Sequence, residues 1–169
     1  PYLERRGIPV LGVLPHEQLL QSISVRDLNK ILNGEILSSE DAADALVERL
    51  MVGAMSVHSA LGYFRRQPNK AVITGGDRPG IQLAALETST RCLILTGDLR
   101  PSDVILQRAE EVHVPIILAK FDTLTTIQLI EQYFGRTRFH QQKKIQRFVD
   151  LLETGFDFDR FYQALGLTR

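Results

Sequence analysis

The sequence predicts an α/β fold: a three-layer α/β/α domain with a mostly parallel sheet, followed by a C-terminal helical tail. The main observation is a series of three strand–turn–helix units between Ala71 and Phe134. Strands that alternate with helices at this spacing imply right-handed crossovers and a parallel sheet. The expected strands are Ala71–Thr74, Cys92–Thr96 and Pro115–Ala119, and the expected helices begin after Arg78, at Pro101 and at Thr123.

The first two units are near copies of each other, which supports the repeated arrangement. Ile73–Pro79 reads ITGGDRP and Leu95–Pro101 reads LTGDLRP. Each places Thr-Gly at the strand end, followed by an Asp, an Arg and a proline suited to the first position of a helix. In the third unit, Leu124, Ile127 and Ile130 keep the spacing of one helix face.

Shorter elements are predicted on either side of these units. An apolar run over Gly7–Leu14 predicts a buried strand, and capping residues predict a helix over Ser24–Leu32. Apolar residues at helical spacing predict another helix over Ser38–Leu50. Further expectations are a strand over Met51–Val57, helical turns over His58–Phe64, a helix carrying the basic segment Arg136–Arg147 on its outer face, and a last helix over Asp157–Leu165.

Composition indicates a packed protein without a strong charge bias. The chain has 169 residues, 44% of them hydrophobic, and 20 basic residues balance 20 acidic ones. This balance gives no support to a general nucleic-acid or membrane-surface binder. The single cysteine, Cys92, excludes an internal disulfide and suits a reducing cytoplasm, which is the expected location. No signal peptide or membrane-spanning run is visible, and the chain begins at Pro1 without Met, as a fragment of a longer protein would.

The best candidate site is the glycine turn Thr74–Arg78. Gly75 and Gly76 allow either a positive φ or close approach by another group, and Asp77 or Arg78 is expected at the helix N-cap. Backbone N–H groups at this helix start, together with the Arg78 guanidinium, suit a phosphate or carboxylate. The alternative is a tight structural turn whose Asp and Arg cap the helix or pair with each other; the residues alone leave both readings open.

The carboxyl ends of parallel strands share one edge of a sheet, where ligands of open α/β sheets usually bind. We therefore expect the strand-end residues of the three units to gather there. The predicted ligand-binding residues are Thr74, Gly75, Gly76, Asp77, Arg78, Thr96, Gly97, Asp122 and Thr123. For Asp122 and Thr123, a helix cap is the stronger reading.

Catalytic chemistry finds no support in the sequence, and no catalytic residue, metal site or cofactor is predicted. The four histidines are scattered, without metal-ligand spacing. Neither a nucleophile elbow, a P-loop motif nor a G-x-G-x-x-G fingerprint is present. The basic segment Arg136–Arg147 favours a solvated helix face, with binding to an acidic partner as the minority reading.

Residues from about Val52 to Arg138 resemble the DRTGG domain, a regulatory module named for an Asp-Arg-Thr-Gly-Gly signature. The matching residues are Thr74–Arg78, supported by the blocks Val52–Val57, Ile81–Leu86, Leu95–Gly97 and Asp122–Thr126. The resemblance implies a fold like the amino-terminal domain of the bacterial HPr kinase, and association between copies as a dimer. It also implies a role in sensing nucleotides or other metabolites.

Residues Arg6–Leu37 are similar, through the run Ile8–Pro15, to the end of a dethiobiotin-synthetase-like P-loop domain. The combination resembles the amino-terminal region of long bacterial phosphotransacetylases and related phosphotransacetylase-like proteins. It implies three parts: an upstream-domain remnant over residues 1–37, a DRTGG-like domain over 38–135, and a helical tail over 136–169.

The leading hypothesis is a non-catalytic regulatory domain that dimerises and senses a small anionic metabolite or nucleotide. One alternative is a purely structural dimerisation module. Another is part of a P-loop ATP-dependent or acetyl-transfer enzyme whose catalytic domain lies outside this chain. No nucleic-acid or membrane partner is expected.

Overall fold

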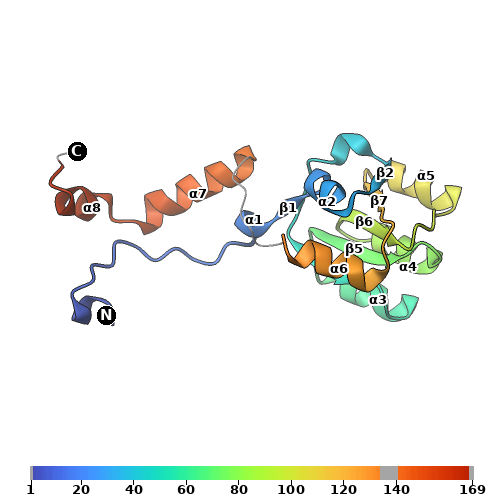
Figure 1. Cartoon of the computed structure of the whole chain (residues 1–169), viewed down its shortest axis with the longest axis horizontal. Helices are drawn as coiled ribbons and strands as arrows, with labels where there is room; N and C mark the ends of the chain where they lie inside the picture. The colour runs from blue at the N-terminus through green and yellow to red at the C-terminus, as the bar shows by residue number, and fades with distance from the viewer. Residues whose placement is uncertain (1, 134–140, 168–169) are drawn as a thin grey trace. The chain divides into compact units, whose positions relative to one another are not determined.

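The computed structural model describes residues 2–133 and 141–167 and divides into two compact units (Figure 1). One unit, Gln21–Thr137, contains the main sheet, and the other combines Pro1–Leu20 with Arg138–Arg169. Within the described ranges, no helix has the length and apolar character needed to cross a membrane.

The sheet unit is built on five strands in the order β2-β7-β6-β5-β4. The strands β4 (Arg49–Val52), β5 (Lys70–Gly75), β6 (Thr90–Thr96) and β7 (Ile116–Leu118) are parallel. β2 (Glu35–Ser38) closes one edge of the sheet antiparallel to β7. The predicted mostly parallel sheet is confirmed, and a separate two-stranded ladder joins β1 (Ile23–Ser24) to β3 (Leu46–Val47).

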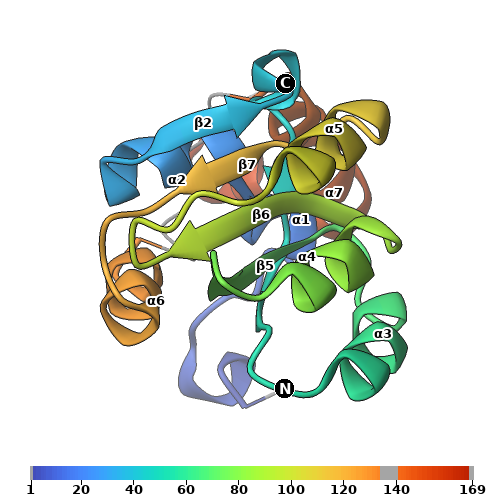
Figure 2. The same ribbon diagram turned by 90° about the vertical axis from the view of Figure 1, so that its right-hand side faces the viewer.

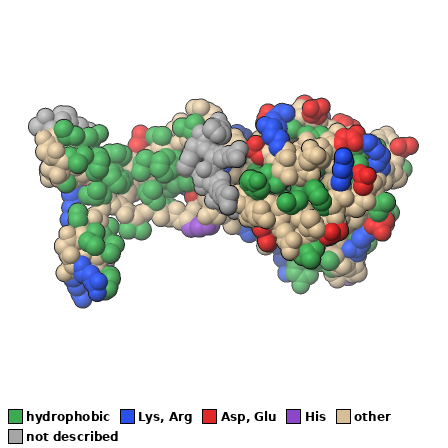
Figure 3. All heavy atoms as spheres, viewed as in Figure 1, with side chains coloured by type: hydrophobic (Ala, Val, Ile, Leu, Met, Phe, Trp, Pro, Cys, Tyr) green, Lys and Arg blue, Asp and Glu red, His purple; other side chains and the backbone are tan. Residues whose placement is uncertain are grey.

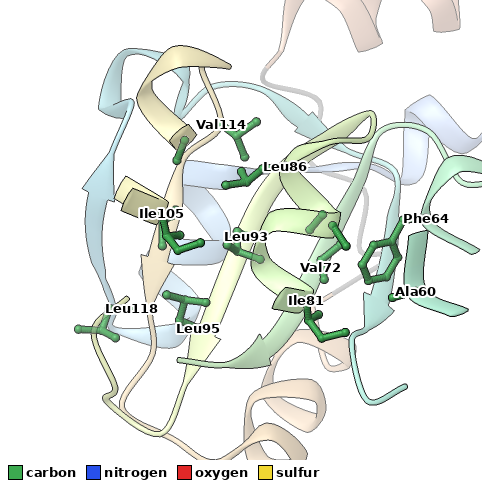
Figure 4. Close-up of a cluster of buried hydrophobic side chains, with 14 residues drawn as sticks. Ala60, Phe64, Val72, Ile81, Leu86, Leu93, Leu95, Ile105, Val114 and Leu118 are labelled. Carbon is green, nitrogen blue, oxygen red and sulfur yellow. The ribbon is translucent and has the colours of Figure 1, made fainter. Parts of the chain in front are cut away.

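Helices cover both faces of the sheet, which confirms the three-layer arrangement (Figure 2). Strand residues alternate between two cores because successive side chains point to opposite faces. Val72 and Leu93 belong to the first core (Figure 4), whereas Ala71 and Ile94 belong to the second. The first core is covered by α3 (Val57–Arg65), α4 (Pro79–Leu86) and α5 (Asp103–Glu111), and the second by α2 (Val25–Leu32) and α6 (Thr123–Glu131).

Helix starts in this unit follow the capping signals of the sequence. The side chains of Ser24, Ser56 and Asp122 each accept a hydrogen bond from the backbone N–H three residues further on. Pro79 is the first residue of α4, as predicted, and of the two predicted N-cap residues, Asp77 and Arg78, it is Arg78 that holds the position.

The helix predicted over Ser38–Leu50 is wrong. The segment forms a 3-10 turn, η2 (Glu40–Ala42), followed by β3 and the start of β4. Ser39 has a φ of +48°, a left-handed conformation that a right-handed helix does not accept. The backbone of β3 and β4 finds its hydrogen bonds in β1 and β5 instead. The strand predicted over Met51–Val57 correspondingly ends at Val52.

The sheet unit also takes in residues that the sequence assigned to an upstream remnant. It begins at Gln21, so α2 and β2 belong to it. Leu28 and Leu32 of α2 are fully buried in the same core as Ile94.

The second unit contains η1 (Glu4–Arg6), the greater part of α1 (Gln18–Gln21), α7 (Gln142–Gly155) and α8 (Phe158–Ala164). The predicted last helix is confirmed as α8. The buried strand predicted over Gly7–Leu14 is wrong, because the described backbone there makes an isolated antiparallel bridge between Gly12 and Phe156, and Val13 is 80% exposed. An apolar run forms a strand only where a neighbouring strand pairs with it.

Basic residues of α7 are divided between its faces. Lys143 and Arg147 are exposed, as the helical spacing predicts, whereas Lys144 is buried. Arg147 donates to the Glu17 carboxylate at 2.6 Å. The remaining basic residues of the predicted segment, Arg136 and Arg138, lie outside the described residues.

Candidate functional site

The carboxyl edge of the sheet brings the ends of three strands together. Thr74 and Gly75 end β5, Thr96 ends β6, and Asp122 follows β7. The loops after β6 and β7 are joined by a 2.8 Å hydrogen bond from the Gly97 N–H to the Phe121 carbonyl. All nine predicted binding residues therefore lie on this edge or at the helix starts beside it.

Three threonine side chains link neighbouring strand ends in a row. The Thr74 hydroxyl donates to the Gly53 carbonyl at 3.4 Å, and the Thr96 hydroxyl lies 3.4 Å from the Thr74 carbonyl. The Thr96 and Thr123 hydroxyl oxygens are 2.9 Å apart. Because Thr74 and Thr96 are almost fully buried, these contacts replace the water that polar groups at a strand end need.

Gly76 is required by close approach rather than by its backbone angles. Its φ is not positive, but a Cβ at this position would overlap the carbonyl oxygen of Leu99 in the loop after β6. A Cβ on Gly75 would overlap the Asp77 carboxylate, which is a flexible side chain. The turn after β6 does adopt the left-handed conformation, since φ is +82° at Gly97 and +57° at Asp98.

The Arg78 guanidinium donates hydrogen bonds to backbone carbonyls. One terminal nitrogen donates to the Gly53 carbonyl and the other to the Met55 carbonyl at 2.8 Å. These acceptors are neutral, and among the described residues no carboxylate forms an ion pair with Arg78. Arg78 therefore ties the start of α4 to the loop between β4 and α3, and its positive charge is not neutralised by an ion pair there.

The backbone N–H groups near the turn are partly engaged. The Gly76 N–H donates to the Thr96 carbonyl at 3.4 Å and the Arg78 N–H to the Gly75 carbonyl at 3.2 Å. The helix start thus offers an anion fewer free donors than the sequence pattern suggests.

Gln82 is a buried polar residue that the sequence prediction missed. Its side-chain amide nitrogen donates to the Gly75 and Gly76 carbonyls, both at 3.0 Å, and so attaches the glycine turn to α4. Its carbonyl oxygen has no protein partner among the described residues. The available signal was a glutamine within the apolar segment Ile81–Leu86, one turn after Pro79.

Asp122 is a helix cap, as the stronger reading of the sequence predicted. Its carboxylate accepts from the Thr125 N–H at 2.9 Å and from the Thr125 hydroxyl at 2.8 Å. These two hydrogen bonds hold the pKa of the Asp122 carboxyl below its usual value, and the one from the Thr125 backbone N–H has the larger effect. The Thr123 hydroxyl forms its hydrogen bond with the Thr96 hydroxyl.

Metal and thiol chemistry find no site in the parts of the chain that the structure describes. No group of three or more His, Cys, Asp or Glu residues there is arranged to hold a metal ion. The Cys92 thiol is fully buried, and burial raises its pKa. A thiol kept protonated inside a core is not a nucleophile.

Comparison with known proteins assigns the family. The sequence model of the DRTGG domain matches residues 27–133. This chain belongs to the DRTGG domain family. The resemblance noted over residues 52–138 is therefore confirmed, and the DRTGG match begins earlier, within α2.

The curated relatives of this DRTGG chain include phosphate acetyltransferases. The enzyme of Nitratidesulfovibrio vulgaris is 30% identical over 155 residues, which are 86% of this chain and 22% of the relative. The enzyme of Synechocystis is 27% identical over 95% of this chain and 24% of the relative. The chain thus spans about a quarter of the length of these relatives.

A solved structure shares the DRTGG fold. It contains the CBS and DRTGG domains of the regulatory region of Clostridium perfringens pyrophosphatase, complexed with its activator, diadenosine tetraphosphate. The TM-score is 0.60 and the sequence identity 22%, over 79% of this chain and 67% of the other.

Proposed function

We propose that the sheet unit is a non-catalytic regulatory module that binds a small anionic metabolite or nucleotide at the carboxyl edge of its sheet. The observation that carries the proposal is Arg78, a partly buried cation whose described hydrogen-bond partners are neutral carbonyls. Arginine presents a planar fork of donors that matches phosphate oxygens. The adjoining loops after β5 and β6 add a surface that remains accessible at Asp77 and Gly97.

The nucleotide class is proposed by analogy with the structural neighbour. The pyrophosphatase regulatory region that shares this fold is complexed with diadenosine tetraphosphate, a multiply phosphorylated dinucleotide. A ligand of that kind matches the chemistry of an arginine beside a glycine turn.

The proposal predicts a ligand-dependent rise in thermal stability. We would measure Tm against ATP, diadenosine tetraphosphate, acetyl phosphate and coenzyme A, because a ligand that binds only the folded state raises Tm as its concentration rises. At about 100 times the dissociation constant the gain is about 2.7 kcal/mol, or several degrees. Each variant is compared with its own unliganded Tm.

We expect Arg78→Ala to lose this shift and Arg108→Ala to keep it. Arg108 is a matched control, because it is an arginine on α5 that pairs with Glu87 and Glu111 away from the carboxyl edge. An unchanged shift in Arg78→Ala would remove the anion site from this turn. The absence of any shift across the four compounds would contradict ligand sensing itself.

A second candidate function is a structural dimerisation module. Its support is a set of apolar side chains exposed at the same edge: Leu99 is 48% exposed, Phe121 39% and Leu124 65%. Exposed apolar side chains interspersed with charged ones are visible on the sheet unit in Figure 3. Neighbouring apolar side chains in water favour association with a second surface.

The dimer reading predicts that Leu124→Glu weakens self-association about tenfold or more, because the interface would have to bury a carboxylate. Leu124 lies in the first turn of α6, where an acidic residue is favourable, so the variant is expected to fold. The measurement is sedimentation equilibrium, with Tyr63→Glu on α3 as the control for an exposed apolar residue elsewhere. If Tyr63→Glu dissociates the dimer and Leu124→Glu does not, the contact lies on α3.

The third reading, an enzyme whose catalytic domain lies outside this chain, concerns a longer protein. It predicts a Gly-Lys-Thr/Ser loop, or an acetyl-transfer domain, elsewhere in the open reading frame.

A further inference from the structure

We propose that Arg78 is a releasable latch: a phosphate-bearing ligand at the carboxyl edge withdraws its guanidinium from the Gly53 and Met55 carbonyls and so frees the start of α3. The inference rests on the proposed function and names the regulatory step at the same site. Its basis is the pair of hydrogen bonds by which Arg78, the N-cap of α4, holds a loop that belongs to a different strand–helix unit.

The held segment is short and leads directly into a helix. β4 ends at Val52, and α3 begins at Val57 with Ser56 as its cap. Between them, the described contacts of Gly53 lie inside the fold: its N–H donates to the Ile73 carbonyl at 2.8 Å, and a Cβ would press on Ile81. Ala54 and Ser56 are exposed. The Arg78 contacts are therefore a principal restraint on the outer half of this loop.

The latch can exchange its partners because its present acceptors are neutral. A phosphate oxygen carries negative charge, so its contact with the Arg78 guanidinium adds Coulomb attraction and a two-pronged geometry that two separate neutral carbonyls do not offer. When Arg78 leaves, the Gly53 carbonyl keeps the Thr74 hydroxyl as donor, and the Met55 carbonyl lies beside solvent-exposed neighbours. Release therefore leaves neither carbonyl buried without a donor.

Movement of the loop is transmitted to the first turn of α3 and not to the whole helix. Ala60 and Phe64 anchor the helix in the core beside Val72 and Ile81 (Figure 4). Val57, in contrast, is 49% exposed and packs on α4, since a Cβ on Gly80 would lie 2.8 Å from its Cγ2. Release of the loop would alter the apolar surface at Val57, which is the output that a partner domain can read.

Hydrogen exchange measured by mass spectrometry tests the latch in the unliganded chain. We expect Arg78→Ala to speed amide exchange over residues 53–60 by about tenfold or more, because two hydrogen bonds from a charged donor are lost. Arg78→Lys, which keeps the charge without the fork, should give an intermediate rate. Peptides from β6 and the Arg108→Ala variant serve as controls and should be unchanged. Equal exchange over residues 53–60 in wild type and Arg78→Ala would overturn the latch.

The ligand arm uses diadenosine tetraphosphate with the wild-type chain. A rise in Tm together with faster exchange over residues 53–60 supports the proposal. A rise in Tm with unchanged or slower exchange there overturns the latch and leaves the proposed binding function standing. If neither Tm nor exchange responds, both the binding of this ligand and its release of the latch are refuted.

Discussion

Gly76→Ala is expected to lower the free energy of unfolding by about 2–3 kcal/mol, the upper part of the range of about 1–3 kcal/mol for forcing an extra carbon into a packed site. The added Cβ would overlap the Leu99 carbonyl oxygen and would lie 2.6 Å from both its carbonyl carbon and its Cβ. The backbone of the loop after β6 would have to move, and the hydrogen bond between the Gly76 N–H and the Thr96 carbonyl would move with it. Urea denaturation gives the change as a shift of the midpoint at constant slope.

Gly62→Ala is the matched control for this substitution. Gly62 lies in α3, and a Cβ there meets nothing within 4 Å. Alanine is favoured over glycine inside a helix by about 0.8–1 kcal/mol, so this variant should be more stable than wild type. If Gly76→Ala stayed within about 0.5 kcal/mol of wild type, the packing of the two loops would not be what requires the glycine.

Lys70→Met is expected to raise the free energy of unfolding at pH 7 by about 1–3 kcal/mol. Lys70 is fully buried, with its ammonium group 2.9 Å from the Thr88 hydroxyl, 3.2 Å from the Ser89 carbonyl and 5.6 Å from the centre of the Phe64 ring. Burial lowers the pKa of Lys70 to about 8 from 10.5. A shift of that size corresponds to about 3 kcal/mol against the charged form, from which the lost hydrogen bonds subtract about 1 kcal/mol.

The same residue gives a pH dependence of defined sign. Between pH 8 and 10.5 the unfolded chain holds a proton on Lys70 that the folded chain has released, so wild-type stability gains from this residue as pH rises. The advantage of Lys70→Met should therefore shrink over this window. The Cys92 thiol, whose pKa burial raises, acts in the opposite direction in both proteins and cancels in their difference.

Urea titrations of both proteins at several values between pH 7 and 10.5 measure this difference. Lys120→Met is the control for a lysine-to-methionine change at an exposed position, because the Lys120 side chain is exposed in the loop after β7. A constant difference between wild type and Lys70→Met across the window would show that the ammonium group is not desolvated in the fold.

The three repeated units were predictable from sequence because their signals are local. A short apolar run, a glycine turn and a helix-starting proline follow one another within a few residues, as in Ile73–Pro79. The Ser38–Leu50 segment failed for the opposite reason. Its apolar residues fit one helix face, and only its pairing with distant strands decides that the backbone is extended.

The location of the candidate site was also predictable, but the hydrogen-bond partners of its residues were not. Parallel strands bring their carboxyl ends to one edge of a sheet, and this rule alone predicts that Thr74, Thr96 and Asp122 lie near one another. The partners of Arg78 are backbone carbonyls of Gly53 and Met55, and a carbonyl carries no signature in the sequence. Gln82 was missed because glutamine side chains are mostly exposed, so the residue type gives no sign that this one is buried.

The antiparallel strand β2 has a consequence for the order in which the fold can assemble. β4 to β7 are joined by successive crossovers between neighbouring strands. β2, in contrast, pairs with a strand far along the sequence, with Ile36 opposite Ile117 of β7. Contacts so distant in sequence slow folding, because a long loop must close before they form. During synthesis on a ribosome, β2 is made before β7, so its backbone donors and acceptors stay without their strand partner until β7 has emerged.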